Sequence, residues 1–121
     1  MASVTLERLI DKMHLKNYTP DIDLTNKKIK QPDINRPGMQ IAGFFEHYET
    51  TRVQVFGFVE YCYMKEMDEA RKTEIFDKLI HPDIPALIFC RDLEPDEIFL
   101  EVARANNVPV LSTDMPTSAF M

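Results

Sequence analysis

The fold is decided by the stretch Val53-Gln54-Val55-Phe56-Gly57-Phe58-Val59, which is β-branched or aromatic at nearly every position. A strand with one face in solvent alternates apolar and polar residues, whereas a strand covered on both faces forms a nearly continuous apolar run. We therefore expect residues 53–59 to form a strand in the interior of a layered domain.

Two further apolar runs, residues 86–90 and 108–111, have the same character. Pro109 lacks the N–H that a central strand needs, so it predicts an edge position for the last strand. Strands that alternate with helices are joined by right-handed crossovers in a parallel sheet. The sequence thus predicts an α/β fold, a small three-layer sandwich with a mostly parallel sheet.

Helix signals fill the segments between these strands. One helix is expected to start within residues 60–67, and Asp68 is placed to cap a second helix that stops at residues 81–82. Pro95 at a first helical position, with acidic residues around it, predicts the start of a third helix. Residues 106–107, both asparagine, can end that helix in a left-handed conformation.

The N-terminal third has a different pattern. Apolar residues recur at helical spacing from Leu6 and predict an amphipathic helix over residues 4–14. Residues 15–40 are polar and contain three prolines, which favours short strands and turns over a long helix. The one basic cluster, residues 27–30, is typical of a solvated loop or an edge strand.

Length and composition narrow the function classes. The 121 residues, 45% of them apolar, suit one domain with one sizeable core. The net charge is 14 − 20 = −6, which argues against a nucleic-acid partner. With only three glycines, the chain has neither a P-loop nor a dinucleotide-binding loop, because both need clustered glycines to admit a phosphate.

Targeting signals are also missing from the sequence as it stands. Its longest apolar runs have about five residues, far fewer than the roughly 20 that cross a bilayer. Charged residues interrupt the N-terminus where a signal peptide would be apolar. The two cysteines, with no other secretory sign, are typical of a reducing compartment. We expect a cytoplasmic location and no membrane partner.

Candidate metal ligands and nucleophiles are few. The three histidines lie more than 30 positions apart and have no second ligand at metal spacing, so no metal site is expected. Cys62, between two tyrosines, is expected to fill the core. Cys90 ends a strand just before Arg91, a cation that would lower the pKa of its thiol, but no histidine is placed to act as its base. We therefore predict no catalytic residue in this chain.

Two segments are candidate anion-binding sites. The first is the turn containing Asn35, Arg36 and Gly38, where a bidentate donor adjoins amides that a tight turn can leave free. The second follows the last strand and offers the hydroxyls of Thr113, Thr117 and Ser118. The alternatives are a structural turn with a surface arginine for the first, and a plain helix cap for the second.

The order of these segments resembles a known family. The matching pieces, which span nearly the whole chain, are Asn35-Arg36-Pro37-Gly38, Ile41 to Phe45 with Tyr48, Arg52 to Gly57, Pro85 to Phe89, Arg91 to Pro95, and Val108 to Leu111 leading to Thr117-Ser118. Together they are similar to the N-terminal domain of HPr kinase/phosphorylase, the bacterial enzyme that phosphorylates and dephosphorylates a serine of the phosphocarrier HPr.

The resemblance carries implications for the fold and the site. It implies an α/β domain like the uridine-nucleotide-binding domain of the Mur ligases. In that comparison a Ser-Arg pair lies near the nucleotide, and here Asn35 beside Arg36 is the equivalent pair. A donor is thereby kept, although the serine is not.

The resemblance also implies how activity is distributed. In the family, a second, C-terminal domain holds the P-loop, the catalytic acid and the HPr-docking surface, and it uses ATP and magnesium. Residues 1–121 would then be a single N-terminal domain without cofactor and without activity of its own. The family further implies HPr as the partner of the full-length enzyme, a homo-oligomer (a hexamer) as its assembly, and carbon catabolite regulation as its role.

Three functions remain open at this point. The first is a regulatory or assembly domain of the bifunctional kinase/phosphorylase. The second is a stand-alone module that senses a metabolite or nucleotide near Asn35, Arg36 and Gly38. The third is a subunit-interaction domain in which exposed aromatic side chains pack against another subunit, namely Phe44, Phe45, Tyr48 and Phe58.

Overall fold

Four parallel strands form the centre of the molecule in the computed structural model, which describes residues 4–22, 24, 28–29, 34–45, 48 and 50–115. These strands are β4 (Ile34–Asn35), β5 (Val53–Phe56), β6 (Leu87–Phe89) and β7 (Val110–Ser112). A fifth, β2 (Lys16–Asn17), runs antiparallel to β7, and the order in the sheet is β2-β7-β6-β5-β4. The predicted mostly parallel sheet is confirmed.

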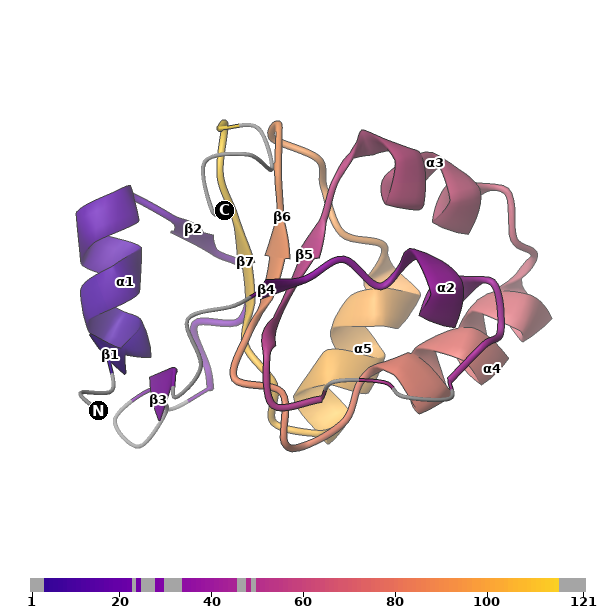
Figure 1. Cartoon of the computed structure of the whole chain (residues 1–121), viewed down its shortest axis with the longest axis horizontal. Coiled ribbons are helices and arrows are strands. Elements are labelled where there is room, and N and C mark those ends of the chain that lie inside the picture. Colours follow the sequence, from indigo (N-terminus) through magenta and orange to yellow (C-terminus); the bar gives the residue numbers. More distant parts are fainter. Residues whose placement is uncertain are drawn as a thin grey trace.

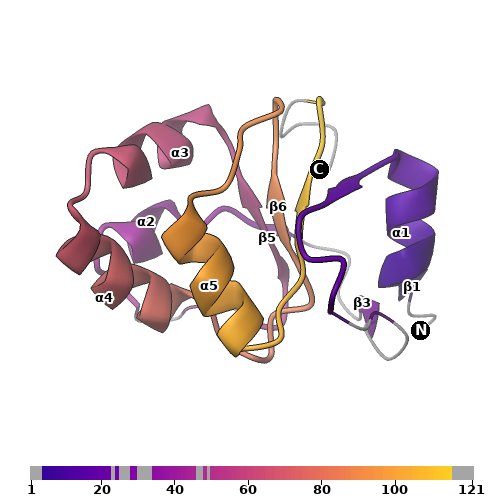
Figure 2. The same cartoon turned by 180° about the vertical axis from the view of Figure 1, so that it is seen from behind.

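The helices that connect the parallel strands lie on one face of the sheet (Figures 1 and 2). The chain visits β4, β5, β6 and β7 in spatial order, so every right-handed crossover returns over the same face. The crossover helices are α2 (Gly38–Ile41), α3 (Phe58–Lys65), α4 (Glu69–Leu79) and α5 (Glu97–Ala105). Helix α1 (Leu6–Met13) lies on the opposite face, which completes the three predicted layers.

A second, two-stranded sheet lies beside the main one. Strand β1 (Val4–Thr5) pairs antiparallel with β3 (Lys28–Ile29). The central residues of the basic cluster at 27–30 thus belong to a short strand, one of the two structures expected for them. Residues 27 and 30 lie outside the part of the chain that the structure describes.

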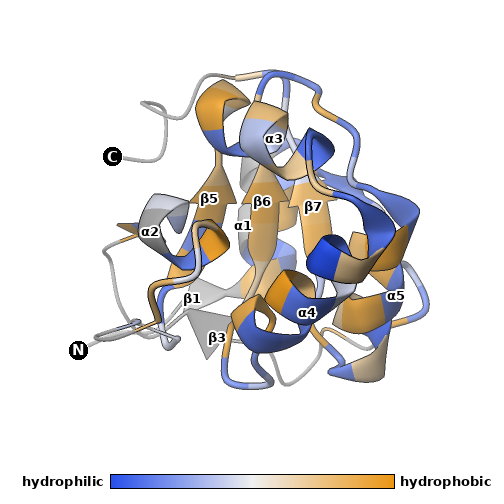
Figure 3. Cartoon of the chain, turned by 90° about the vertical axis from the view of Figure 1, so that its right-hand side faces the viewer, coloured by the Kyte–Doolittle hydropathy of each residue, from blue (hydrophilic) through white to orange (hydrophobic). Residues whose placement is uncertain are grey.

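The sheet separates two hydrophobic cores. Alternate residues of each strand point to opposite faces, so Phe56 and Phe89 face the crossover helices while Val55 and Ile88 face α1. Phe56 stacks on Phe89 with their ring centroids 4.9 Å apart, and the edge of Phe99 on α5 meets both rings. The three central strands β5, β6 and β7 are mainly apolar, as Figure 3 shows. This two-sided burial explains the continuous apolar runs in the sequence.

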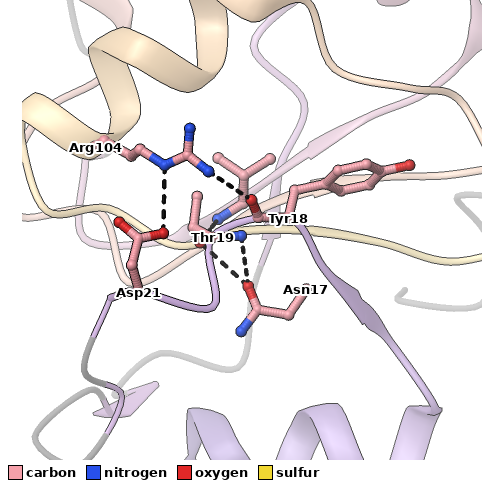
Figure 4. A network of polar contacts seen from close by, with 6 residues as sticks. Asn17, Tyr18, Thr19, Asp21 and Arg104 are labelled. Atoms are coloured by element: carbon pink, nitrogen blue, oxygen red, sulfur yellow. Dashed lines mark hydrogen bonds and ion pairs between the residues drawn. The ribbon is translucent and has the colours of Figure 1, made fainter.

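A polar network joins the segment after β2 to β7 and α5 (Figure 4). The buried Thr19 hydroxyl oxygen accepts a hydrogen bond from the Val110 amide (3.0 Å) and donates one to Asn17 Oδ1 (3.2 Å). From α5, Arg104 donates to the Tyr18 carbonyl (3.2 Å) and lies 3.4 Å from an Asp21 carboxylate oxygen. These contacts fix the antiparallel edge of the sheet.

The prediction of a strand over residues 53–59 was too long. Strand β5 ends at Phe56, and Gly57 is the N-cap of α3. Phe58 and Val59 are therefore helical, and their side chains are 59% and 73% exposed. The last residues of the apolar run are thus not buried strand, because they begin a helix whose outer face is apolar.

The edge position predicted from Pro109 was wrong. Strand β7 lies inside the sheet, between β6 and β2. Pro109 precedes the first paired residue, so the sheet does not require the N–H that it lacks. Its carbonyl accepts a hydrogen bond from the Leu87 amide (2.9 Å), and the first strand amide, that of Val110, is bound by Thr19.

The predicted helices are present, but three start at shifted positions. Helix α1 begins at Leu6 rather than at residue 4, and α3 begins at Phe58, before the predicted range 60–67. Asp68 caps α4 by accepting from the Arg71 amide at 2.8 Å, as expected. Helix α5 begins at Glu97 with Asp96 as its N-cap, so Pro95 lies before the helix rather than at its first position. Asn107 has the expected left-handed conformation, with φ of 58°. Between residues 15 and 40, the residues that the structure describes form short strands and turns, together with the start of the four-residue helix α2.

Neither a membrane span nor a metal cluster stands out in the residues that the structure describes. None of their helices combines the length and the apolar content that crossing a bilayer requires. Likewise, His, Cys, Asp and Glu side chains do not gather there in a group of three that could hold a metal ion.

Candidate functional site

The carboxyl ends of β4 and β5 bring together the first candidate site. Asn35 ends β4 and pairs in register with Gln54 of β5. The side-chain amide of Asn35 donates to Gln54 Oε1 at 2.6 Å, and the buried Gln54 amide donates in turn to the Arg52 carbonyl at 2.9 Å. The Asn35 donor on which the sequence prediction depended is thus engaged within the sheet.

Arg36, the next residue, forms an ion pair with Glu60 of α3. Its Nε lies 2.9 Å from Oε1 and its Nη2 2.9 Å from Oε2, a bidentate arrangement. The Glu60 side chain is 6% exposed and the Arg36 side chain 45%. The hydrogen bonds to Glu60 raise the pKa of Arg36, and burial opposes this only in part. The pair clamps the end of β4 to α3.

Glu60 also forms a hydrogen bond at the N-terminus of α3. Its Oε1 accepts a hydrogen bond from the Gly57 amide at 3.2 Å, which satisfies one of the amides that a helix N-terminus leaves unpaired. The sequence reasoning missed Glu60 altogether. The spacing of Gly57 and Glu60, an N-cap and its third helical residue, is the signal that could have found it.

Gly38 does not present a free amide. Its N–H donates to the Arg36 carbonyl at 2.8 Å across Pro37, whose φ of −81° and ψ of 44° are close to those of an inverse γ-turn. A Cβ built on Gly38 would meet nothing within 4 Å, so the position does not depend on glycine for space. At this turn, the side chains of Asn35 and Arg36 and the backbone amide of Gly38 therefore all donate hydrogen bonds to partners within the protein.

The second candidate site lies elsewhere along the same edge. Thr113 directly follows β7 and is buried, and its hydroxyl accepts from the Met115 amide at 3.2 Å. Strands β5 and β6 separate β7 from β4, a distance of about 14 Å at the usual strand spacing. The structure therefore does not bring Thr113 next to Arg36. Thr117 and Ser118 lie outside the described residues.

The two cysteines differ from each other in exposure. Cys90 is buried, and it directly follows β6, which ends one residue earlier than predicted. Cys62 is exposed on α3, so the prediction that it fills the core was wrong. The face of α3 that turns inward is occupied instead by Glu60 and Met64.

The outer face of α3 is the most exposed apolar feature of the described residues. It carries Phe58, Val59 and Tyr63, the last 50% exposed, and Phe44 after α2 is 63% exposed. Phe45 and Tyr48, predicted to be exposed with them, are half-buried, and the Tyr48 hydroxyl donates to the Leu79 carbonyl at 2.6 Å. Burial raises the pKa of Tyr48. Two of the four predicted interaction aromatics are thus free to contact a partner.

The class of protein follows from this geometry. The molecule is a small three-layer α/β domain whose polar edge is occupied by an amide pair and an ion pair, while one crossover helix exposes an apolar face. Comparison with known proteins makes the assignment specific. Residues 4–121 match the family model described as "HPr Serine kinase N terminus", and the chain belongs to that family.

Relatives of this chain are longer proteins. It is 43% identical over 121 residues to the HPr kinase/phosphorylase of Lachnoclostridium phytofermentans, covering all of this chain and 39% of that protein. It is 34% identical over 116 residues to the HPr kinase/phosphorylase of Streptococcus equinus, covering 96% of this chain and 37% of the relative. The chain thus spans about two fifths of the length of these relatives.

A solved structure has a similar fold. It comprises the CBS and DRTGG domains of the regulatory region of Clostridium perfringens pyrophosphatase, complexed with the activator diadenosine tetraphosphate. The TM-score is 0.61 at 16% sequence identity, and the match covers 96% of this chain and 44% of that one. At this identity the likeness concerns the fold alone.

Proposed function

We propose that this chain is the non-catalytic regulatory or assembly domain of an HPr serine kinase/phosphorylase. The observation that carries the proposal is the match to the family's N-terminal model over residues 4–121, in relatives more than twice as long as the chain. The site geometry agrees with it. Arg36 and Glu60 neutralise each other, and the large apolar side chains of Phe58, Val59 and Tyr63 are exposed on α3.

The rest of the proposal concerns the whole enzyme. The kinase and phosphorylase reactions, on a serine of HPr and with ATP and magnesium, belong to a C-terminal P-loop domain outside this chain. The enzyme works in the cytoplasm as a homo-oligomer and controls carbon use. The names of the relatives support HPr as its substrate.

A direct assay tests whether the chain is inactive. The 121-residue protein is incubated with ATP, magnesium and HPr, and serine phosphorylation of HPr is measured beside the full-length relative from Lachnoclostridium phytofermentans. We expect phosphorylation with the relative and none with the chain. Phosphorylation by the chain alone would refute a non-catalytic role.

A chimera tests the regulatory or assembly role. Residues 1–121 replace the matching segment of the same relative, and kinase rate and molecular mass in solution are compared with those of the parent and of a variant that lacks the segment. We expect the chimera to keep the number of subunits of the parent, and the deletion variant to differ from the parent in the number of subunits or in kinase rate. A deletion variant with the same number of subunits and the same rate as the parent would contradict the role.

We also propose, as a second function, that Asn35, Arg36 and Gly38 bind an anionic metabolite or nucleotide. The favouring observation is that the Arg36 side chain is still 45% exposed beside Glu60, at the edge where parallel strands end. Calorimetric titration with uridine nucleotides, phosphate and sugar bisphosphates tests it on wild type and Arg36→Ala. Heat that disappears in the variant supports the site, and no heat with any ligand removes it. The hydroxyls of Thr113, Thr117 and Ser118 remain a second, separate candidate for anion binding. The same titration on Thr113→Val tests it.

A further inference from the structure

A strained turn, residues 90–93, follows strand β6 at the carboxyl edge of the sheet. Arg91 and Asp92 both have a φ of 56°, and in the described part of the chain they are the only adjacent non-glycine residues in the left-handed region. The Leu93 amide donates to the Cys90 carbonyl at 3.2 Å, which closes the four-residue turn in the pattern of type I′. Turns of this type favour Asn-Gly at their two central positions, because most side chains clash with the backbone in this conformation.

The segment after β7, residues 113–115, holds the turn in this conformation. The Arg91 amide donates to the Met115 carbonyl at 3.0 Å, and the Asp92 amide donates to the Thr113 carbonyl at 2.9 Å. The Met115 amide in turn donates to the Thr113 hydroxyl at 3.2 Å, which shapes the segment. The two backbone hydrogen bonds therefore offset the strain of the turn and tie it to the chain that leaves the sheet after β7.

On its other side the turn adjoins the first candidate site. The Cys90 amide donates to the Phe56 carbonyl at 3.0 Å. Phe56 precedes Gly57, whose amide is bound by Glu60, the partner of Arg36. The turn thus lies between the candidate site and the segment after β7, and backbone hydrogen bonds join it to both.

We propose that the turn and residues 113–115 form a two-state latch. In the closed state, which the structure shows, Arg91 and Asp92 are held in the left-handed conformation. In the open state both hydrogen bonds to residues 113–115 are broken together, and the two turn residues relax to negative φ. Strain in the closed state lowers the free energy of opening, so the latch opens without unfolding of the sheet.

The latch gives the domain a place where binding can change its conformation. A partner that binds residues 113–115 only when they are free of the turn would shift the latch to its open state. The two states are defined by contacts of this chain alone. The proposal therefore does not depend on the proposed function.

Native-state hydrogen exchange of the ¹⁵N-labelled chain tests the latch. Exchange of the Arg91 and Asp92 amides is followed by NMR at low urea concentrations. The Gln54 amide, which donates to the Ala86 carbonyl within the sheet, reports global unfolding. We expect the two latch amides to share one opening constant, at least about tenfold larger than that of Gln54 and insensitive to urea, because a local opening exposes little surface. Two different opening constants, or exchange with the rate and urea dependence of Gln54, would overturn the proposal.

A pair of strain-relieving variants gives the matched control. Arg91→Asn/Asp92→Gly introduces the pair that type I′ turns favour, while His14→Gly relieves the same kind of strain at an exposed position outside the latch, where φ is 54°. We expect the opening constant of the latch to fall about fivefold or more in the turn variant and to stay unchanged in His14→Gly, after correction for the intrinsic exchange rate of each residue type. No fall in the turn variant, or an equal fall in both, would overturn the proposal. If a variant fails to fold, the exchange data of the wild type still decide.

Discussion

At the scale of single residues, Glu60 is a buried carboxylate with both oxygens in use. It pairs with Arg36 and accepts from the Gly57 amide. Removing one partner of a buried ion pair leaves the other charge desolvated and alone. We predict that Arg36→Ala lowers the free energy of unfolding by about 2 kcal/mol, less than for a fully buried pair because Arg36 is half-exposed. Urea denaturation measures the loss.

A double variant separates the ion pair from its surroundings. In Arg36→Ala/Glu60→Gln no carboxylate is left uncompensated, and a glutamine can still accept from the Gly57 amide. We expect the double variant to be more stable than Arg36→Ala alone. Additive losses from the two single variants would show that the two side chains do not interact.

Tyr48 gives a prediction with a pH dependence. Its hydroxyl donates to the Leu79 carbonyl, and Tyr48→Phe should cost about 1 kcal/mol at neutral pH. Burial raises the pKa of Tyr48 in the folded chain, so above about pH 10 the unfolded chain ionises first and stability falls. The phenylalanine variant lacks this loss. The gap between the two proteins, followed by urea denaturation, should therefore narrow as the pH rises above about 10, and a constant gap would contradict the assignment.

At the scale of elements, Asp96 connects two helices. It caps α5 by accepting from the Ile98 amide at 2.8 Å and pairs with Lys72 of α4. Burial acts to raise the pKa of Asp96, but the hydrogen bonds from Lys72 and the Ile98 amide outweigh it and lower the pKa. A lowered pKa means stability that is present above about pH 4 and is lost as the pH falls below that value.

Substitution of Asp96 tests this link. Asp96→Asn keeps a cap acceptor but loses the charge, while Asp96→Ala loses both and should cost about 1 kcal/mol at pH 7. The difference between wild type and Asp96→Asn should shrink as the pH is lowered below about 4, as measured by denaturation at a series of pH values. Asp68→Ala is the matched control, because Asp68 caps α4 and forms no described ion pair. If the stability difference between wild type and Asp96→Asn does not depend on pH, the charge of Asp96 does not contribute to stability.

The elements that the sequence predicts well are those with local causes. The runs that become β5 and β6 are apolar because both faces are covered, and Asp68 caps α4 from three residues away. The elements that escape prediction depend on distant partners. Strand β2 has no apolar run of its own. It forms because it pairs with β7 and because Thr19, which follows it, is hydrogen-bonded to β7.

In the candidate site, too, the local feature could be predicted from the sequence and the contacts with distant residues could not. The turn at residues 35–38 was correctly located, since proline and glycine mark it in the sequence. Its partners were not foreseen, because Gln54 and Glu60 lie 19 and 24 positions away from Asn35 and Arg36. Whether the turn binds an anion is still a prediction, to be decided by the titration.

At the scale of the whole molecule, the second core depends on α1. Helices α2 to α5 cover one face of the sheet, and on the other face α1 packs against a smaller cluster. Leu6 is fully buried there, together with Val53, Val55, Ile88 and Leu111. A sheet with one bare apolar face would not be stable in water, so the N-terminal helix should be required for the fold although it lies outside the crossovers.

Truncation of one side chain tests that requirement. Leu6→Ala removes buried methyl groups and leaves a cavity between α1 and the sheet, so we predict a loss of about 3 kcal/mol in the free energy of unfolding. Glu7→Ala, at the next, exposed position of the same helix, should change it by less than about 0.5 kcal/mol. Both values come from urea denaturation followed by circular dichroism. If the two variants unfold at the same urea concentration, α1 is an appendage and the sheet is stabilised from one face alone. If Leu6→Ala unfolds far earlier in a single transition, the two cores fold as one unit.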